Sequence, residues 1–212
     1  MSPDLEPKRR GGVLLPTLLI LVGVVVAFVI FTGFYTEFMW FDAVDKTQVF
    51  TISLVTRAIM FAIMFAIMFV VSSLALFIAF RTRPSYVGAT PEQASLERYR
   101  VAIEPYRKWI ALAIVFVLSF FAGLAGSGEY GTYLLWQNST PFGQVDPQFA
   151  LDLSFYTFEL PFFRFILGYA FALVILSLMI VTAVQYLYGG LRLQPKGERA
   201  TRAAQAQLSA LL

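Results

Sequence analysis

The stretch that decides the fold runs from residue 58 to residue 80 and reads AIMFAIMFAIMFVVSSLALFIAF. It contains no charged residue, and about 20 mostly apolar residues are what an α-helix needs to cross about 30 Å of hydrocarbon. Three further stretches of the chain have the same character. We therefore predict four transmembrane helices, at residues 13–34, 58–80, 109–126 and 165–187.

The composition of the 212-residue chain agrees with this reading. Hydrophobic residues make up 58% and charged residues 14%, and the mean hydropathy is +0.72. Soluble domains carry roughly 25% charged residues, so this chain has too few to cover a water-exposed surface. Disordered chains are poor in apolar residues, so disorder is excluded as well. We expect an all-α membrane protein with four transmembrane helices and interfacial amphipathic helices.

The chain contains neither cysteine nor histidine. This excludes disulfides, thiolate nucleophiles and iron–sulfur clusters, and it excludes imidazole catalysis and metal sites of the HExxH type. Any chemistry would have to come from carboxylates, hydroxyls, Lys, Arg and the backbone. We predict no catalytic residue, no cofactor and no metal.

Basic residues are unevenly distributed between the predicted loops. Residues 1–12, 81–108 and 188–212 hold 13 of the 16 Lys and Arg, whereas residues 35–57 and 127–164 hold the remaining three. Because Lys and Arg accumulate on the cytoplasmic side, we predict cytoplasmic termini, two outer loops and a multi-pass protein of the bacterial plasma membrane. The net charge of +3 is then a topology signal, and we expect no nucleic-acid partner.

Small residues in two of the predicted spans indicate close helix packing. Residues 58–69 repeat the tetrapeptide Ala-Ile-Met-Phe three times, and the spacing of four places the alanines on one small-xxx-small stripe. We interpret the neighbouring methionine stripe as packing, although methionine can bind Cu(I). The third span offers another close approach at its glycines. The candidate packing residues are Ala58, Ala62, Ala66, Gly123 and Gly126.

Two segments on the predicted cytoplasmic side carry helix signals. Thr90-Pro91-Glu92-Gln93 resembles a capping box with Pro at the first helical position, and the helix would run to about Glu104 with one apolar face. It would lie on lipid headgroups or on its own bundle, or dock a partner. A second helix is predicted from Thr201 to Leu212. Because the sequence stops as a hydrophobic pattern begins, we expect a fragment of a longer chain.

Both predicted outer loops are rich in aromatic and acidic residues. Residues 38–41 read FMWF and lie where aromatic belts usually lie. Arg57 precedes the second span and Arg164 precedes the fourth. An arginine at a span end usually extends to the interface. A structural ion pair with an outer acid such as Asp45 or Glu159 is the alternative.

The second outer loop holds the remaining candidate functional residues. Asp146 and Pro147 predict the start of a helix that ends near Pro161. In such a helix Asp152 and Glu159, seven residues apart, share one face and lie about 10 Å apart along the axis, too far to share one site without a bridging group. These carboxylates would form the polar face of a membrane-surface helix, or alternatively a cation site or an outer entrance.

A family resemblance extends these predictions. Residues 146–162 read DPQFALDLSFYTFELPF and closely resemble the DPxF…D…FYxFxLPF signature of uncharacterised protein family 0182. Phe38 to Phe41, followed by Val49-Phe50 and Thr56-Arg57, resembles the family's first outer loop. The resemblance implies large multi-pass membrane proteins, mainly of actinobacteria, with further spans and a large extracytoplasmic domain beyond this chain. It implies no catalytic residues.

Three kinds of function follow from these observations. We favour a non-enzymatic membrane-anchoring and assembly module of a larger envelope protein or complex. The alternative is part of a lipid or solute transporter, although ionisable residues are missing from the four apolar stretches, where transporters usually place them. A membrane enzyme would need catalytic groups outside this chain or the outer carboxylates. The expected partners are the lipid bilayer and other membrane subunits or a second copy of the chain.

Overall fold

The structure is a computed structural model that describes residues 14–82, 101–188 and 202–211. The regular elements in these ranges are helices, together with one isolated antiparallel bridge. The chain divides into two compact units, residues 1–54 and 55–212. The predicted tail at residues 1–12 and most of the predicted amphipathic helix that starts at Thr90 lie outside the described residues.

The first unit contains helix α1, Leu14–Ala43 (30 residues), and the start of α2, Thr47–Arg81 (35 residues), whereas the greater part of α2 belongs to the second unit. Both helices are longer than predicted, so the predicted loop at residues 35–57 shrinks to three residues. No Gly or Pro follows Phe34 in α1. The helix therefore continues, because its backbone hydrogen bonds stay within the helix. At 1.5 Å per residue α1 is about 45 Å long, which exceeds the hydrocarbon thickness.

The turn between these helices is a Schellman motif built on Asp45. Asp45 has a left-handed backbone conformation with φ of 55°, which Asp tolerates better than most residues. The N–H of Lys46 donates to the Phe41 carbonyl at 2.9 Å, and the N–H of Asp45 donates to the Asp42 carbonyl at 3.0 Å. These two bonds satisfy carbonyls that the helix end would otherwise leave unpaired.

Aromatic packing fixes this turn. The side chain of Phe50 is buried, and its ring centroid lies 5.3 Å from Phe34, 5.6 Å from Phe38 and 5.9 Å from Phe41. The residues predicted to form an interfacial aromatic belt therefore fall into two groups. Phe38 and Phe41 pack within the helical hairpin, whereas Trp40 remains largely exposed.

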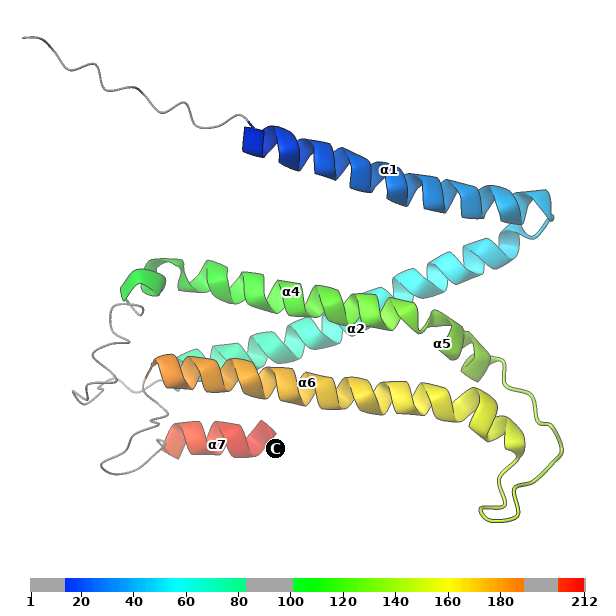
Figure 1. The fold of residues 1–212 in the computed structure, drawn as a ribbon. Helices are drawn as coiled ribbons and strands as arrows, with labels where there is room; N and C mark the ends of the chain where they lie inside the picture. Colours follow the sequence, from blue (N-terminus) through cyan, green and yellow to red (C-terminus); the bar gives the residue numbers. More distant parts are fainter. Residues whose placement is uncertain (1–13, 83–100, 189–201, 212) are drawn as a thin grey trace, which may run out of the picture. The chain divides into compact units, whose positions relative to one another are not determined.

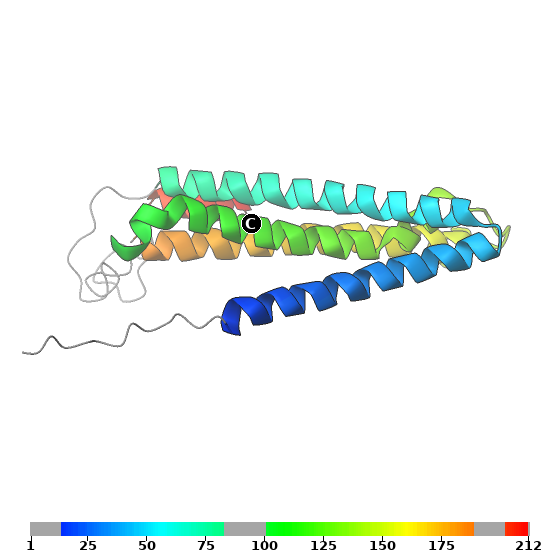
Figure 2. The ribbon, with the colours of Figure 1, turned by 90° about the horizontal axis from the view of Figure 1, so that it is seen from above.

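The second unit is built on three long helices that run side by side, and Figures 1 and 2 show this arrangement for α2, α4 and α6. Helix α4 (Arg107–Gly128) runs opposite to α2 and α6 (Leu160–Leu187). Shorter elements precede or follow these helices: the 3₁₀ turn η1 (Glu104–Tyr106), α5 (Tyr130–Gln137), the π-helical turn η2 (Phe155–Glu159) and α7 (Arg202–Leu211), which contacts α6.

Four helices in the described part of the chain are long and apolar enough to cross a membrane. They are Leu14–Ala43, Thr47–Arg81, Val101–Gly128 and Phe155–Leu187. The prediction of an all-helical chain with four such helices is confirmed. The cytoplasmic placement of the termini stays a prediction.

Few side chains are buried between the helices of the second unit. Ala75 and Ala79 of α2 pack against Val181 of α6. The Tyr169 hydroxyl donates to the Met64 carbonyl at 2.6 Å and links the same two helices. Many large apolar side chains remain exposed along the helices. Such a surface suits hydrocarbon, where burying apolar side chains between helices brings no gain over lipid contact.

Candidate functional site

Asp152 organises the loop between α5 and η2, which is predicted from the sequence to be an outer loop and keeps that name below. Its Oδ1 accepts the N–H groups of Ser154 at 2.8 Å and Phe142 at 3.0 Å, and its Oδ2 accepts the N–H of Gly143 at 2.8 Å. Asp152 directly precedes the first helical residue, Leu153, so it is the N-cap of this helix. The bonds from Ser154 and then Phe142 favour the charged carboxylate and lower the pKa of Asp152 to about 2.

Asp146 closes a turn in the same loop. Its Oδ2 accepts the N–H of Phe149 at 2.9 Å and the hydroxyl of Tyr156 at 3.1 Å. Ala150 has a left-handed φ of 53°, after which the chain returns and forms an antiparallel bridge next to Asp146. The prediction that a helix begins at Asp146 and Pro147 was therefore wrong. The aspartate bonds to the backbone three residues ahead and stabilises a turn instead.

The helix that leads into α6 passes through Pro161. The N–H of Leu160 bonds to the Phe155 carbonyl, five residues back, in the π-helical turn η2. Pro161 has no N–H, and in a regular α-helix its ring would clash with the Thr157 carbonyl. The widened turn directly before Pro161 gives this carbonyl room. The predicted helix end near Pro161 was therefore wrong, and α6 begins at Leu160 rather than at residue 165.

The two carboxylates predicted to share a helical face do not do so. Asp152 lies before the helix and points to the backbone of Phe142 and Gly143, whereas Glu159 lies in η2 and is half-buried. The shared-face prediction failed because the helix starts six residues later than Pro147 suggested. A cation site on one face of a helix therefore loses its geometric basis.

Aromatic residues of the signature hold this loop against the helix ends. The Phe142 ring lies 5.4 Å from Phe158, and the Phe162 ring stacks on Trp136 of α5 at 4.6 Å. Tyr133 of α5 also contacts Phe162, at 5.7 Å. The signature DPQFALDLSFYTFELPF thus combines a carboxylate-ordered turn with an aromatic cluster.

The two outer arginines have different surroundings. Arg57 on α2 is half-buried, and its guanidinium lies 4.2 Å from the centre of the Tyr130 ring on α5. This is a cation–π contact, which the predicted alternatives did not include. Arg164 on α6 is exposed. The structure brings Arg57 to α5 but does not gather the predicted charged residues into one cluster.

The candidate packing residues also divide into two groups. A Cβ on Gly123 would lie 2.8 Å from the Phe61 ring, and a Cβ on Gly126 would overlap the side chain of Met64. Both glycines therefore mark a close approach of α4 to α2. The methionine stripe of the repeat is buried, whereas the alanine stripe is exposed in this chain. Ala58, Ala62 and Ala66 are not packed against α4 or α6, and their close packing stays a prediction.

Sequence reasoning missed a polar group at the start of α4. The Arg107 guanidinium donates to Glu104, and Glu104 accepts a hydrogen bond from the Tyr188 hydroxyl at the end of α6, at 2.9 Å. The Arg107 guanidinium also lies 5.9 Å from the Phe80 ring of α2. The available signal was the pair of cations at Arg107 and Lys108 directly before the span, which the sequence analysis used only for topology.

These contacts limit the chemistry of the outer loop. Asp146 and Asp152 are engaged by backbone and tyrosine donors, so both carboxylates serve to shape the loop. Within the described residues, no group of three or more acidic side chains is placed to hold a metal ion. The loop is ordered by these bonds, and aromatic side chains pack it against α5 and the start of α6.

The fold and the loop define a class of protein: a multi-helix chain whose four long helices are apolar enough to span a membrane. Within that class, the sequence pattern of the uncharacterised protein family UPF0182 matches residues 14–212, and the chain belongs to this family. The resemblance found in the sequence is thereby confirmed.

Several actinobacteria have curated relatives of this chain in the family. A UPF0182 protein of Streptomyces coelicolor is 44% identical over 207 residues, which are 98% of this chain and 21% of the relative. A UPF0182 protein of Frankia casuarinae is 41% identical over 203 residues, 96% of this chain and 20% of the relative. The chain thus spans about a fifth of the length of these relatives. No solved structure matches the chain.

Proposed function

We propose that the chain is a membrane-anchoring and assembly module of a larger protein or complex in the bacterial plasma membrane, with a non-enzymatic role. One observation carries the proposal. Four membrane-length apolar helices make up most of the described chain, while the chain spans only about a fifth of its curated relatives. A segment of this kind supplies membrane attachment for the remainder of a longer protein.

The exposed face of α2 supports the assembly part of the proposal. The Ala-Ile-Met-Phe repeat buries its methionines against α4 and leaves its alanines exposed. A small-residue stripe permits close approach of another helix, and association in lipid depends on such packing. The engaged outer carboxylates support the non-enzymatic part, because their lone pairs already accept backbone donors.

The test is the mass of the intact particle. The protein is extracted from its own membranes in mild detergent, and the masses of the particle and of its polypeptides are measured. We expect a particle that holds further polypeptides or further copies of this chain. A single 23.8 kDa chain without partners would contradict the assembly role. If the chain is found alone and solute uptake into vesicles requires it, the transporter alternative is favoured.

A matched pair of variants locates the assembly surface. Ala62→Leu adds bulk to the exposed alanine stripe of α2, and Ala172→Leu adds the same bulk to an exposed alanine of α6. We expect Ala62→Leu to shift the particle to a smaller mass and Ala172→Leu to leave it unchanged. Equal behaviour of the two variants would exclude the alanine stripe as the assembly surface.

A further inference from the structure

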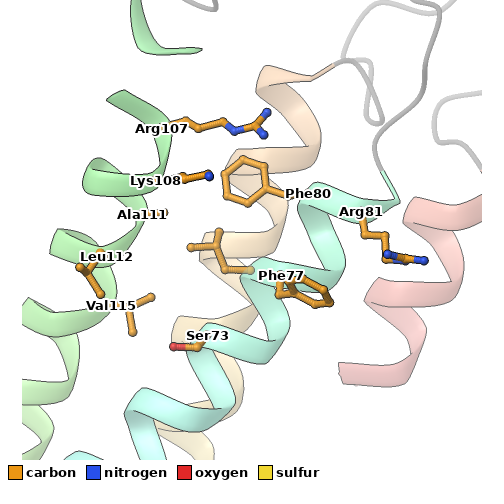
Figure 3. Close-up of a pocket in the computed structure, with 10 residues that line it drawn as sticks. Ser73, Phe77, Phe80, Arg81, Arg107, Lys108, Ala111, Leu112 and Val115 are labelled. Atoms are coloured by element: carbon orange, nitrogen blue, oxygen red, sulfur yellow. The ribbon is translucent and has the colours of Figure 1, made fainter. Parts of the chain in front are cut away.

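A groove of about 510 Å³ opens between α2 and α4 at the end of α4 opposite to the outer loop. Figure 3 shows its two walls, α2 with Phe77 and Phe80 on one side and α4 with Leu112 and Val115 on the other. Most lining side chains are apolar. The groove lies beside the last turns of α2 and the first turns of α4, where both helices reach the end of their apolar stretches.

Three cationic side chains line the polar end of this groove: Arg81, Arg107 and Lys108. In Figure 3 Arg107 and Lys108 extend from α4 toward Phe80, whereas Arg81 points away from α4. Lys108 is exposed. The rim facing the groove therefore carries two cationic groups from consecutive residues of one helix, and the Glu104 carboxylate partly offsets the charge of Arg107.

Arg107 is held in place and still has donors to offer. Its NH1 group donates to Glu104, whose other oxygen is bonded by the Tyr188 hydroxyl, and its guanidinium lies near the Phe80 ring. A guanidinium has five N–H donors, so the bond to Glu104 leaves others for a second anion. Such a fixed guanidinium suits a phosphate, because less side-chain freedom is lost on binding.

A second, apolar cavity of about 420 Å³ adjoins the same rim. It lies between α2, α4 and α6, and its lining includes Ile114, Leu118 and Leu176. The groove and the cavity share four lining residues: Leu76, Phe80, Arg107 and Ala111. Two apolar spaces thus diverge from one cationic rim, in the way that two acyl chains diverge from one headgroup.

We propose that this region binds an anionic phospholipid, with its phosphate at Arg107 and Lys108 and its acyl chains in the groove and the adjoining cavity. A lipid enters the site laterally from the bilayer. Its headgroup then lies at the membrane depth of the cationic rim, and its acyl chains lie at the depth of the apolar walls. Basic pockets between transmembrane helices are known to bind anionic headgroups. A soluble anion would use only the rim and leave the apolar walls exposed. The proposal is independent of the assembly role.

The experiment measures lipid binding to the intact protein in mild detergent by native mass spectrometry. The two lipids are phosphatidylglycerol and phosphatidylcholine with identical acyl chains. We expect phosphatidylglycerol to bind several times more tightly. Lys108→Gln should weaken phosphatidylglycerol binding about fivefold, the effect of roughly 1 kcal/mol per cation near the surface, and leave phosphatidylcholine unchanged.

Two further variants separate charge from shape. Arg164→Gln removes one charge from an exposed position on α6 at the opposite end and should leave both affinities unchanged. Ala111→Phe fills the shared wall without changing charge and should weaken binding of both lipids. Equal binding of the two lipids, or an equal loss in Lys108→Gln and Arg164→Gln, would overturn the proposal.

A soluble competitor tests whether the site takes a lipid or a free phosphate. Glycerophosphoglycerol, the deacylated form of phosphatidylglycerol, carries the same phosphodiester without acyl chains. We expect it to leave phosphatidylglycerol bound at concentrations equal to that of the lipid. Displacement at equal concentration would show that the rim alone binds the anion and would overturn the lipid assignment.

Discussion

The two ends of the α2–α4 pair differ in packing and in their use of charge. At the outer end Gly123 and Gly126 let the helices touch, and the nearby carboxylates of Asp146 and Asp152 bond to the loop backbone. At the other end a groove separates the same helices and cationic side chains line it. The ends differ in side-chain bulk, because α4 has glycines where the helices touch, whereas the large side chains of Phe80 and Arg107 line the groove at the other end.

The largest expected effect comes from breaking the closed end. Gly126→Leu places a side chain where even a Cβ would overlap Met64, so α2 and α4 must separate. We expect a loss of about 2–3 kcal/mol in the free energy of unfolding, as for other overpacked cores. The measurement is denaturant-induced unfolding in detergent micelles.

The control for this change lies two residues further along α4. Gly128→Leu makes the same substitution where nothing lies within 4 Å of an added Cβ. We expect a change of less than about 1 kcal/mol, because replacing a helical glycine costs nothing sterically here and reduces backbone freedom in the unfolded chain. If both variants lose equal stability, the glycine contact does not close this end.

A smaller effect is expected where the outer carboxylates order the loop. Asp152→Asn keeps one oxygen acceptor but turns an amide NH₂ toward one of the backbone donors at Phe142 or Gly143. We expect hydrogen exchange of residues 141–154 to rise about tenfold, in line with the loss of a helix cap. Exchange along α4 should not change, and a rise there would contradict a purely local role.

The same carboxylate predicts a pH dependence at the outer end. The folded-state pKa of Asp152, about 2, lies below its ordinary value of 3.8. The charged form therefore stabilises the loop fully above about pH 5, and this stabilisation is lost as the pH falls through 3.8 toward 2. The protection of residues 141–154, that is, their exchange rate relative to the intrinsic amide rate at the same pH, should fall in that window.

The Asn variant of Asp152 serves as the control for this pH step. Because Asn does not titrate, we expect the loss of protection between pH 5 and pH 2 to be smaller in Asp152→Asn than in the unchanged protein. An identical pH profile in both proteins would assign the step to another group and contradict the role given to Asp152.

The four apolar helices could be predicted from the sequence because hydrocarbon requires long, uncharged stretches. Their ends could not, because a helix does not stop where the hydrocarbon stops. Asp45 ends α1 through its left-handed conformation, and no apolar pattern reveals this. Pro161 predicted a helix end, but the π-helical turn before it lets the chain continue.

The sequence also could not show which face of α2 packs against α4. Every position of the Ala-Ile-Met-Phe repeat recurs with the same spacing of four, so each residue type forms a stripe. Only the surface of the neighbouring helix α4 determines which of these stripes is buried. Gly126 leaves a hollow on α4 that the flexible Met64 fills better than an alanine would, and the Phe61 ring lies against Gly123. The two aspartates of the outer loop were found by sequence, but their backbone partners depend on a chain reversal at Ala150.

The smallest effect concerns the buried serines between the two ends. Ser177 of α6 is fully buried, and its hydroxyl has no hydrogen-bond partner among the described residues. Ser119 of α4 is equally buried, but its hydroxyl donates to the Val115 carbonyl at 2.7 Å. Removing an unsatisfied polar group relieves a desolvation cost, whereas removing a satisfied one loses a bond. The two serines therefore predict opposite signs for the same substitution.

We expect Ser177→Ala to raise the free energy of unfolding by up to about 1 kcal/mol and Ser119→Ala to lower it by about 0.5–1 kcal/mol. Both changes remove one oxygen from a fully buried site, so the difference between them isolates the hydrogen bond. Thermal unfolding of the two variants in the same detergent measures it. A loss of stability in Ser177→Ala as large as that in Ser119→Ala would contradict the unsatisfied state of the Ser177 hydroxyl.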